Sequence, residues 1–375
     1  MTGHLFKPIR LLRVVLALTA GACLASSQQS SNLQSRPMDT AIRARVEALL
    51  KSHRVPGAAI AIIRNREVTY LDGFGLTGND PSEKVTPSTI FQAASLSKPV
   101  FAYAVLELSR QGRLNLDAPL TDYLPPPYLH EQEPWEPEAV TRKDVLEDPR
   151  LQRITARMIL THSAGFPNWA RQAPLTIDFE PGQKWSYSSE GYVYLQRVIE
   201  HIVGEPFEDI MRDMVFSPLH MDDSSFVEPH STRAAAGHDR NGLMVKADSW
   251  SRPLASTSLY TSVRDYARFV TSFLDSGAAH VSLEAATSQT IPVDSGLGLS
   301  WGLGWGVEDY ERKLYFFHWG ANTGFQAFVL GSVDGKNAVV ILTNGESGLD
   351  LSADLVQLIL NQRHPLFSFY MLHPQ

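Results

Sequence analysis

Two short apolar runs at opposite ends of the chain place the strongest constraint on its fold. Ala58–Ile63, near the beginning, and Ala338–Leu342, near the end, are uninterrupted apolar segments of strand length. Val68–Leu71 follows the first run after a polar turn, and Phe325–Leu330 precedes the second, with Asp334-Gly335 as a hairpin signal between them. Neighbouring strands joined by tight turns predict an antiparallel sheet to which both chain ends contribute.

The chain between these strands reads as mostly helical. Apolar residues recur at helical spacing in residues 42–53, 95–111, 154–160, 195–202, 207–215, 266–274 and 352–361. Trp301–Val307 and Leu314–His318 add strands, and the proline- and carboxylate-rich residues 120–150 predict a surface loop. Because strands and helices do not alternate as in a parallel sheet, we predict an α+β fold with a helical insertion. The expected regions are an α/β domain (39–115 and 255–375) and a mostly helical domain (116–254).

The first 25 residues have the pattern of a signal peptide. Basic residues from Lys7 to Arg13 precede an apolar run, Val14–Leu24, that is too short to cross a bilayer core of about 30 Å. Small residues follow, so we expect a protein that is exported, periplasmic or secreted, with residues 26–38 as a linker. An N-terminal anchor helix is the alternative.

Cys23, at the end of that run, is the only cysteine among 375 residues. Ala20-Gly21-Ala22-Cys23 resembles a weak lipoprotein box, so both a lipid tether on Cys23 at the membrane surface and simple cleavage nearby stay open. One cysteine excludes an internal disulfide and a cysteine-based metal cluster. The formal net charge of −7 gives no basic footprint, which argues against nucleic acid as a partner.

The first candidate catalytic segment is Ser95-Leu96-Ser97-Lys98-Pro99. Residues three apart at the start of a helix share a face, so Lys98 can reach the Ser95 hydroxyl. The unpaired N–H groups of a helix N-terminus suit a developing oxyanion. Pro99 would clash with the Ser95 carbonyl in a regular helix, which predicts an irregular first turn. A lone Ser-x-x-Lys also fits an N-cap serine beside a solvated lysine.

Two further segments make the pattern specific. Tyr187-x-Ser189 lies just before a strongly periodic helix, and His318-Trp319-Gly320 ends a predicted strand. With Ser95-x-x-Lys98, they stand in the order and spacing of the three motifs of class C β-lactamases, D-alanyl-D-alanine carboxypeptidases, penicillin-binding proteins and related esterases. The chain resembles this family over roughly residues 40–345, and the resemblance implies a β-lactamase/DD-peptidase-like fold.

The resemblance implies a serine hydrolase with Ser95 as the acylated nucleophile. Lys98 and Tyr187, with ordinary pKa values of about 10.4 and about 10, are both candidates for the base. By family likeness the backbone N–H groups of Ser95 and Ala321 form the oxyanion hole. Ser189, His318, Trp319 and Gly320 are expected to contact substrate, the glycine by letting a substrate backbone approach closely. We expect no cofactor and no metal.

Departures from the family pattern bear on the substrate. Class C β-lactamases have Lys-Thr-Gly where this chain has His318-Trp319-Gly320, and Ser189 replaces a usual asparagine. We therefore expect a small-molecule or peptide substrate, hydrolysed by carboxylesterase-like or D-aminoacyl-peptidase-like chemistry. A class C-like β-lactamase and a penicillin-binding sensor with little turnover are the alternatives.

Other residues receive weaker assignments. Trp169, Trp185, Trp319 and Phe325 are candidates for an apolar acyl pocket. His162 and His238 are expected to be structural, and the glycines between 296 and 306 to pack tightly around a strand. Residues 131–148 are expected to be a solvated rim, with a lid over the cleft as the alternative.

Overall fold

Strand pairing between the two ends of the chain organises the protein. The computed structural model describes residues 40–79, 81–171, 173–274, 281–334 and 337–373; the expected signal peptide, Cys23 and the linker lie outside them. The two apolar runs become β1 (Gly57–Arg64) and β12 (Asn337–Thr343), which pair antiparallel at Ile60–Ile341. They belong to an eight-stranded sheet in the order β2-β1-β12-β11-β10-β9-β8-β7. Its other strands are β2 (Glu67–Gly75), β7 (Ile291–Asp294), β8 (Leu299–Trp301), β9 (Gly306–Tyr310), β10 (Lys313–Asn322) and β11 (Phe325–Ser332).

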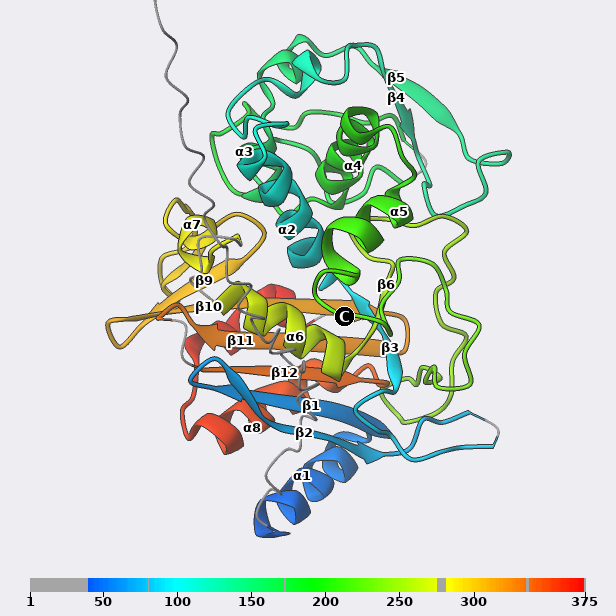
Figure 1. Ribbon diagram of the computed structural model, residues 1–375, viewed down its shortest axis with the longest axis vertical. Helices are drawn as coiled ribbons and strands as arrows, with labels where there is room; N and C mark the ends of the chain where they lie inside the picture. The colour runs from blue at the N-terminus through cyan, green and yellow to red at the C-terminus, as the bar shows by residue number, and fades with distance from the viewer. Residues whose placement is uncertain (1–39, 80, 172, 275–280, 335–336, 374–375) are drawn as a thin grey trace, which may run out of the picture. The chain divides into compact units, whose positions relative to one another are not determined.

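Both faces of this sheet are covered, which explains why its central strands are apolar without alternation. Helices α1 (Thr40–His53) and α8 (Gly348–Leu360) pack on one face, and α6 (Val263–Leu274) packs on the other (Figure 1). Within β1, alternate residues from Ala58 to Ile62 join the core under α1 and α8. The residues between them, from Ala59 to Ile63, join the core shared with α6. The predicted antiparallel sheet built from both chain ends is therefore confirmed.

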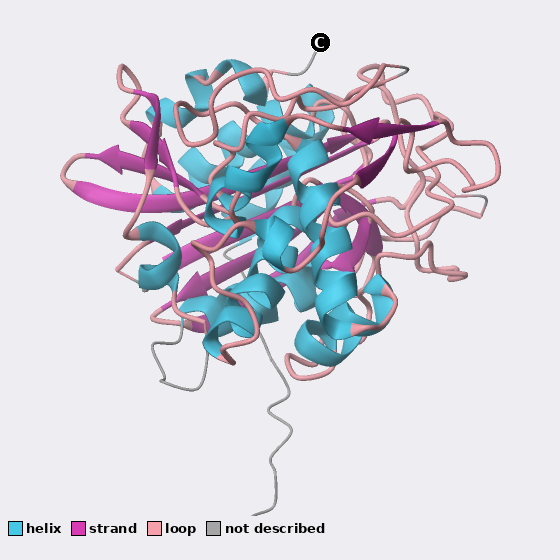
Figure 2. Cartoon of the chain, turned by 90° about the horizontal axis from the view of Figure 1, so that it is seen from above, coloured by secondary structure: helices cyan, strands magenta, loops and turns pink. Residues whose placement is uncertain are grey.

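The middle of the chain supplies most of the remaining helices. Figure 2 shows this mixture of helices and long connecting loops around the sheet. Besides α1, α6 and α8, the described helices are α2 (Ser97–Arg110), α3 (Ala156–Leu160), α4 (Ser189–Val203), α5 (Phe207–Met211) and α7 (Leu283–Thr287). Shorter turns are the π-helical η3 (Arg212–Phe216) and the 3₁₀ turns η1 (Leu120–Asp122), η2 (Pro149–Arg153), η4 (Pro365–Ser368) and η5 (Tyr370–Leu372). The Ser188 side chain caps α4 by accepting from the Gly191 N–H, and Gly204 ends it in the left-handed conformation (φ 82°).

A small two-stranded sheet, which sequence periodicity did not indicate, lies directly before the predicted nucleophile in the chain. It consists of β3 (Ile90–Ala94) and β6 (Leu259–Ser262), and β3 contacts β10 and β11. The helix expected to begin at Ser95 begins instead at Ser97, so Ser95 lies in the turn between β3 and α2. This placement agrees with the irregular first turn expected from Pro99.

Two predicted segments differ from the structure. Residues 120–150 are more than a surface loop, because β4 (Tyr128–Glu131) and β5 (Lys143–Leu146) pair as a hairpin whose His130 is fully buried. The single strand expected over Trp301–Val307 is divided into β8 and β9. Its glycines do pack tightly: a Cβ on Gly302 would lie 2.2 Å from the Ala286 carbonyl oxygen.

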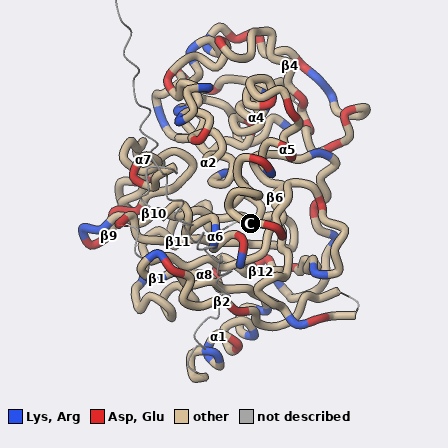
Figure 3. Tube along the Cα trace, in the orientation of Figure 1, with Lys and Arg blue, Asp and Glu red and all other residues tan. Residues whose placement is uncertain are grey.

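The described residues between 40 and 373 pack as one unit, and the division of this unit at residues 115 and 254 stays a prediction. In the described part of the chain, no helix is both long and apolar enough to cross a membrane. Lys and Arg alternate with Asp and Glu along the described trace, with no broad basic stretch (Figure 3).

Candidate active site

Ser95 occupies a sharp turn at the end of β3. The preceding residue, Ala94, has φ 50°, a left-handed conformation that is costly for alanine. Two hydrogen bonds stabilise the turn: Leu96 N–H donates to the Ala93 carbonyl (3.0 Å), and the Ser97 hydroxyl donates to the Ala94 carbonyl (2.6 Å). Ser95 is thereby left partly exposed on the wall of a pocket.

Lys98 lies directly behind Ser95 and is fully buried. Its Nζ is 3.2 Å from Ser95 Oγ and 3.3 Å from Ser189 Oγ, and it donates to the Ser256 carbonyl at 2.8 Å. In the described part of the chain, none of its hydrogen-bond partners is a carboxylate, so no negative charge among them compensates a buried ammonium. Burial accordingly lowers the pKa of Lys98 well below its usual value.

Tyr187 flanks the same pair. Its ring centroid is 4.7 Å from Lys98 Nζ and its side chain is buried. Burial raises the pKa of the Tyr187 phenol, and the interaction with the Ser95 side chain offsets only part of that rise. Burial thus shifts both groups toward their uncharged forms, an amine beside a protonated phenol.

Gly320 fixes the distance between β10 and the turn that carries Ser95. A Cβ at this position would lie 2.1 Å from the Ala93 carbonyl oxygen. The glycine is thus required by the protein's own backbone, whereas the sequence suggested the approach of a substrate. Ala321, the next residue, is exposed on the pocket wall, where its N–H was expected to complete the oxyanion hole.

The third motif divides between the pocket and the interior. Trp319 and Ala321 line the pocket, whereas His318 and Gly320 are absent from its described lining. The His318 ring is fully buried 6.4 Å from the Tyr187 ring. Burial, aided by Lys98, lowers the pKa of His318 to about 3, so this histidine is neutral at physiological pH.

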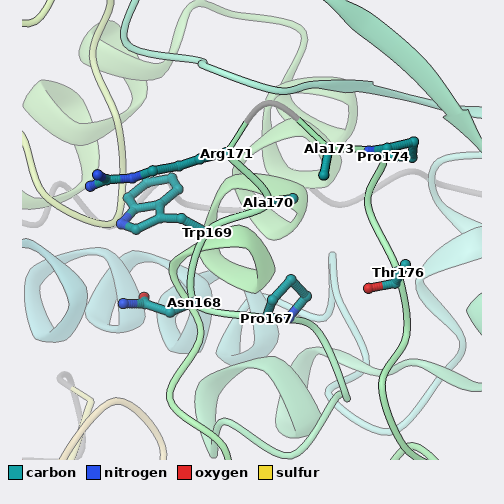
Figure 4. Close-up of a pocket in the computed structure, with 8 residues that line it drawn as sticks. All are labelled: Pro167, Asn168, Trp169, Ala170, Arg171, Ala173, Pro174 and Thr176. Carbon is teal, nitrogen blue, oxygen red and sulfur yellow. The ribbon is translucent and has the colours of Figure 1, made fainter.

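The pocket has a volume of about 820 Å³ and an aromatic wall. Four tryptophans line it: Trp135, Trp169, Trp250 and Trp319. Trp135 and Trp169 meet edge to face at 5.1 Å, and the Arg171 guanidinium lies 5.7 Å from the Trp135 ring centre. In Figure 4 the side chains of Trp169 and Arg171 point the same way, with that of Thr176 on the opposite side of a neighbouring hollow.

The structure brings together most of the predicted site. Ser95, Lys98, Tyr187 and Ser189 meet at one end of the pocket. Of the four aromatic candidates for an apolar pocket, Trp169 and Trp319 line it. Trp185 packs against Tyr187 outside it, and Phe325 lies in the core.

The other weaker assignments also find a place. His162 is buried and accepts a hydrogen bond from Ser188 N–H (3.1 Å), and His238 Nδ1 lies 2.9 Å from the Asn344 carbonyl; both contacts are structural. In the segment 131–148, expected to be a rim or lid, Trp135 and Glu136 form part of the pocket wall.

Sequence reasoning missed several pocket residues. Asn168 accepts from Ser189 N–H through its side chain at 3.2 Å, and Asn322 donates to Gln92 at 2.8 Å. Trp250 and Met371 come from segments without a motif. Trp135 gave a signal in the sequence, because a large apolar side chain within a proline- and carboxylate-rich loop indicates a position that is at least partly buried.

Comparison with known proteins agrees with this geometry. Penicillin-binding protein 4 of Amycolatopsis lactamdurans is 28% identical over 355 residues, covering 85% of this chain and 88% of that protein. Protein flp of Staphylococcus aureus is 24% identical, and the match covers 80% of this chain but only 61% of flp.

Solved structures share the fold. An octameric penicillin-binding protein homologue from Pyrococcus abyssi superposes with a TM-score of 0.70 at 21% identity, covering 88% of this chain and 79% of that one. A β-lactamase/D-alanine carboxypeptidase from Pseudomonas syringae gives 0.72 at 19% identity, covering 86% and 98%. The family model described as Beta-lactamase matches residues 42–363. The chain therefore belongs to the β-lactamase family of serine hydrolases, which are related to penicillin-binding proteins and D-alanine carboxypeptidases.

Proposed function

We propose that the protein hydrolyses an ester or amide with an apolar, aromatic acyl group, through an acyl-enzyme on Ser95. The observation that carries the proposal is the burial of Lys98 against Ser95 without a carboxylate partner among the described residues. A neutral Lys98 donates to the Ser256 carbonyl and to Ser189 Oγ. Its lone pair is then free to accept the Ser95 proton.

The reaction starts with that proton transfer. Ser95 Oγ attacks the substrate carbonyl while its proton passes to Lys98 Nζ, and the N–H groups of Ser95 and Ala321 stabilise the oxyanion. The carbonyl re-forms, and the bond to the leaving group breaks. The leaving group takes a proton from the Tyr187 phenol, which Lys98 then restores. Water releases the acyl group by the same steps in reverse.

The pocket wall supports an aromatic acyl group. Tryptophan faces bind flat apolar groups well, and four of them line the cavity that adjoins Ser95. The third motif offers no cation to a β-lactam carboxylate, because His318 is neutral and buried. We therefore place ester or D-aminoacyl-peptide hydrolysis ahead of β-lactam hydrolysis.

A β-lactamase is the second candidate, because two cations, Arg171 and Lys246, do line the pocket. The deciding experiment compares kcat/KM for p-nitrophenyl phenylacetate and a chromogenic cephalosporin on one purified sample, with Ser95→Ala as the blank. We expect the ester to be preferred. A preference for the cephalosporin would identify a β-lactamase whose carboxylate site differs from Lys-Thr-Gly.

Two controls accompany this comparison. Ser95→Ala should lose covalent labelling by a fluorophosphonate, and undiminished labelling would refute the nucleophile. Intact mass after addition of penicillin tests the sensor alternative, because an adduct that persists without turnover would favour it.

We also propose that the protein is exported, on the pattern of residues 1–25. Fractionation of cells that express the full chain should place it outside the cytoplasm. Incorporation of labelled palmitate that disappears in Cys23→Ala would add a lipid tether, whereas an intact N-terminus in the cytoplasm would contradict export.

A further inference from the structure

A buried histidine outside the catalytic motifs bridges three elements that lie beside the pocket. His130, on β4, is fully buried; its Nδ1 lies 2.9 Å from Asp144 Oδ1 on β5, and its Nε2 lies 3.3 Å from Glu190 Oε2 on α4. Between two ionised carboxylates the ring carries a proton on both nitrogens, because an ionised carboxylate only accepts. The geometry is thus that of an imidazolium between two carboxylates.

The same carboxylates hold residues on both sides of the pocket segment, in 168–171 and in 173–175. Glu190 Oε1 accepts from Ala170 N–H (2.9 Å), and Asp144 Oδ2 accepts from Leu175 N–H (3.0 Å). Trp169 and Arg171, which flank Ala170, line the pocket. The position of this wall therefore depends on where the two carboxylates are held.

The bridge also reaches the β4–β5 hairpin and the first residues of α4. The connection between β4 and β5 carries Trp135, which packs against Trp169. Glu190 follows Ser189, whose hydroxyl contacts Lys98. His130 thus joins the aromatic wall to the start of α4.

We propose that His130 is a positioning residue for substrate selection, which as an imidazolium holds the Trp135–Trp169 wall against the catalytic end of the pocket. The inference rests on the proposed function only in taking this pocket as the acyl site. When His130 loses its charge, the buried Glu190 carboxylate and the partly buried Asp144 carboxylate face a neutral ring, and the wall loosens. Recognition of an aromatic acyl group then weakens, while the reaction at Ser95 proceeds.

The surroundings favour the charged form. Burial lowers the pKa of His130, but the hydrogen bonds and charges of Glu190 and Asp144 outweigh it and raise the pKa overall. The other neighbours are Tyr128 on β4, whose ring lies 6.4 Å away, and Tyr194 on α4, which meets Tyr128 edge to face. The nearby cations, Arg197, Arg252 and Lys143, are paired with Glu131.

The test compares two sulfonyl fluorides that modify a serine nucleophile without turnover. Phenylmethanesulfonyl fluoride carries an aromatic group, and methanesulfonyl fluoride lacks it. Both reagents react with the same hydroxyl. In the ratio of the phenylmethanesulfonyl fluoride rate to the methanesulfonyl fluoride rate, the effect of Lys98 titration therefore cancels, and the ratio reports the contribution of the aromatic wall. Rates are followed by intact mass on the full protein from about pH 6 to about pH 10, because the pKa of His130 is raised above its usual value.

For the wild type, we expect the ratio to fall by about tenfold as the pH rises through the pKa of His130, since charge-assisted hydrogen bonds are lost. In His130→Gln the ratio should be low and independent of pH. Asp144→Asn removes one carboxylate charge but keeps an acceptor, so the step should move to lower pH. The second variant keeps the test decisive if the first does not fold.

His201→Gln is the matched control, because this exposed histidine lies on the same helix, α4. It should reproduce the wild-type ratio at every pH. Folded His130→Gln and Asp144→Asn proteins with the wild-type ratio and step would overturn the inference. Modification that persists in Ser95→Ala would instead refute the proposed function, so the two failures are distinguishable.

Discussion

Replacing Gly320 by alanine tests whether the oxyanion hole depends on the contact between β10 and the turn before Ser95. The new Cβ would lie 2.1 Å from the Ala93 carbonyl oxygen, whereas ordinary contacts begin at 3.4 Å. The two backbones must therefore separate by about 1.3 Å, which is the difference between these distances. Because Ala321 follows Gly320, the two N–H donors of the expected oxyanion hole move apart.

The magnitude follows from this displacement. Loss of one oxyanion donor costs about 10²–10³-fold in rate, or about 3–4 kcal/mol in the barrier. A misplacement of about 1 Å can have a similar effect. We expect Gly320→Ala to lower kcat/KM for p-nitrophenyl phenylacetate by about 10²–10³-fold, mainly through kcat. Overpacking should lower the free energy of unfolding by about 1–3 kcal/mol.

The assay is steady-state hydrolysis, with thermal unfolding and circular dichroism to establish that the variant is folded. Gly345→Ala is the matched control, because its Cβ would be in ordinary contact, 3.4 Å from Val55 Cα. It should keep wild-type activity. A folded Gly320→Ala protein with activity within about threefold of wild type would refute the role given to this contact.

Three further outcomes are expected. Burial lowers the pKa of Lys98, so kcat/KM should rise with pH through that lowered value and level off well before the pH at which free lysine titrates. A rise only at the ordinary lysine pKa would contradict Lys98 as the base. Lys98→Arg cannot lose its proton and should therefore be inactive at every pH. Tyr187→Phe should lower kcat by about 10²–10⁴-fold with an unchanged unfolding midpoint, and a kcat near wild type would exclude the phenol from proton transfer. His364→Ala leaves buried Glu308, 2.6 Å from His364 Nδ1, without that partner and should cost about 3–5 kcal/mol of stability in urea unfolding. A loss below about 1 kcal/mol would show that this contact contributes little to stability.

Local patterns in the sequence were enough for the sheet and for the catalytic end of the site. Apolar runs of strand length and the hairpin signals report pairing between neighbours in the chain, so β1, β2, β11 and β12 were predicted. Ser95-x-x-Lys98 brings its two groups together within one turn, which is a local property. The short strand β3 was missed, because five fully buried residues show no periodicity.

The remaining features depend on contacts between distant segments. Gly320 is recognisable as a glycine of the third motif, but only the position of Ala93 in space shows that the protein's own carbonyl requires it. His130 was read as part of a surface loop, since proline and carboxylate content suggests solvent; its burial depends on Glu190, sixty positions away. The state of Lys98 is likewise set by desolvation, which no spacing encodes.

The sequence by itself thus determined the antiparallel sheet built from both chain ends, the proximity of Ser95 and Lys98, and the family, because these depend on short-range patterns. Only the tertiary structure decided the aromatic wall of the pocket, the lowered pKa values of Lys98 and His318, and the burial of His130 between the Asp144 and Glu190 carboxylates. Each of these depends on burial and on partners that long-range packing brings together, and burial changes the free energy of a charge more than any neighbour in the chain does.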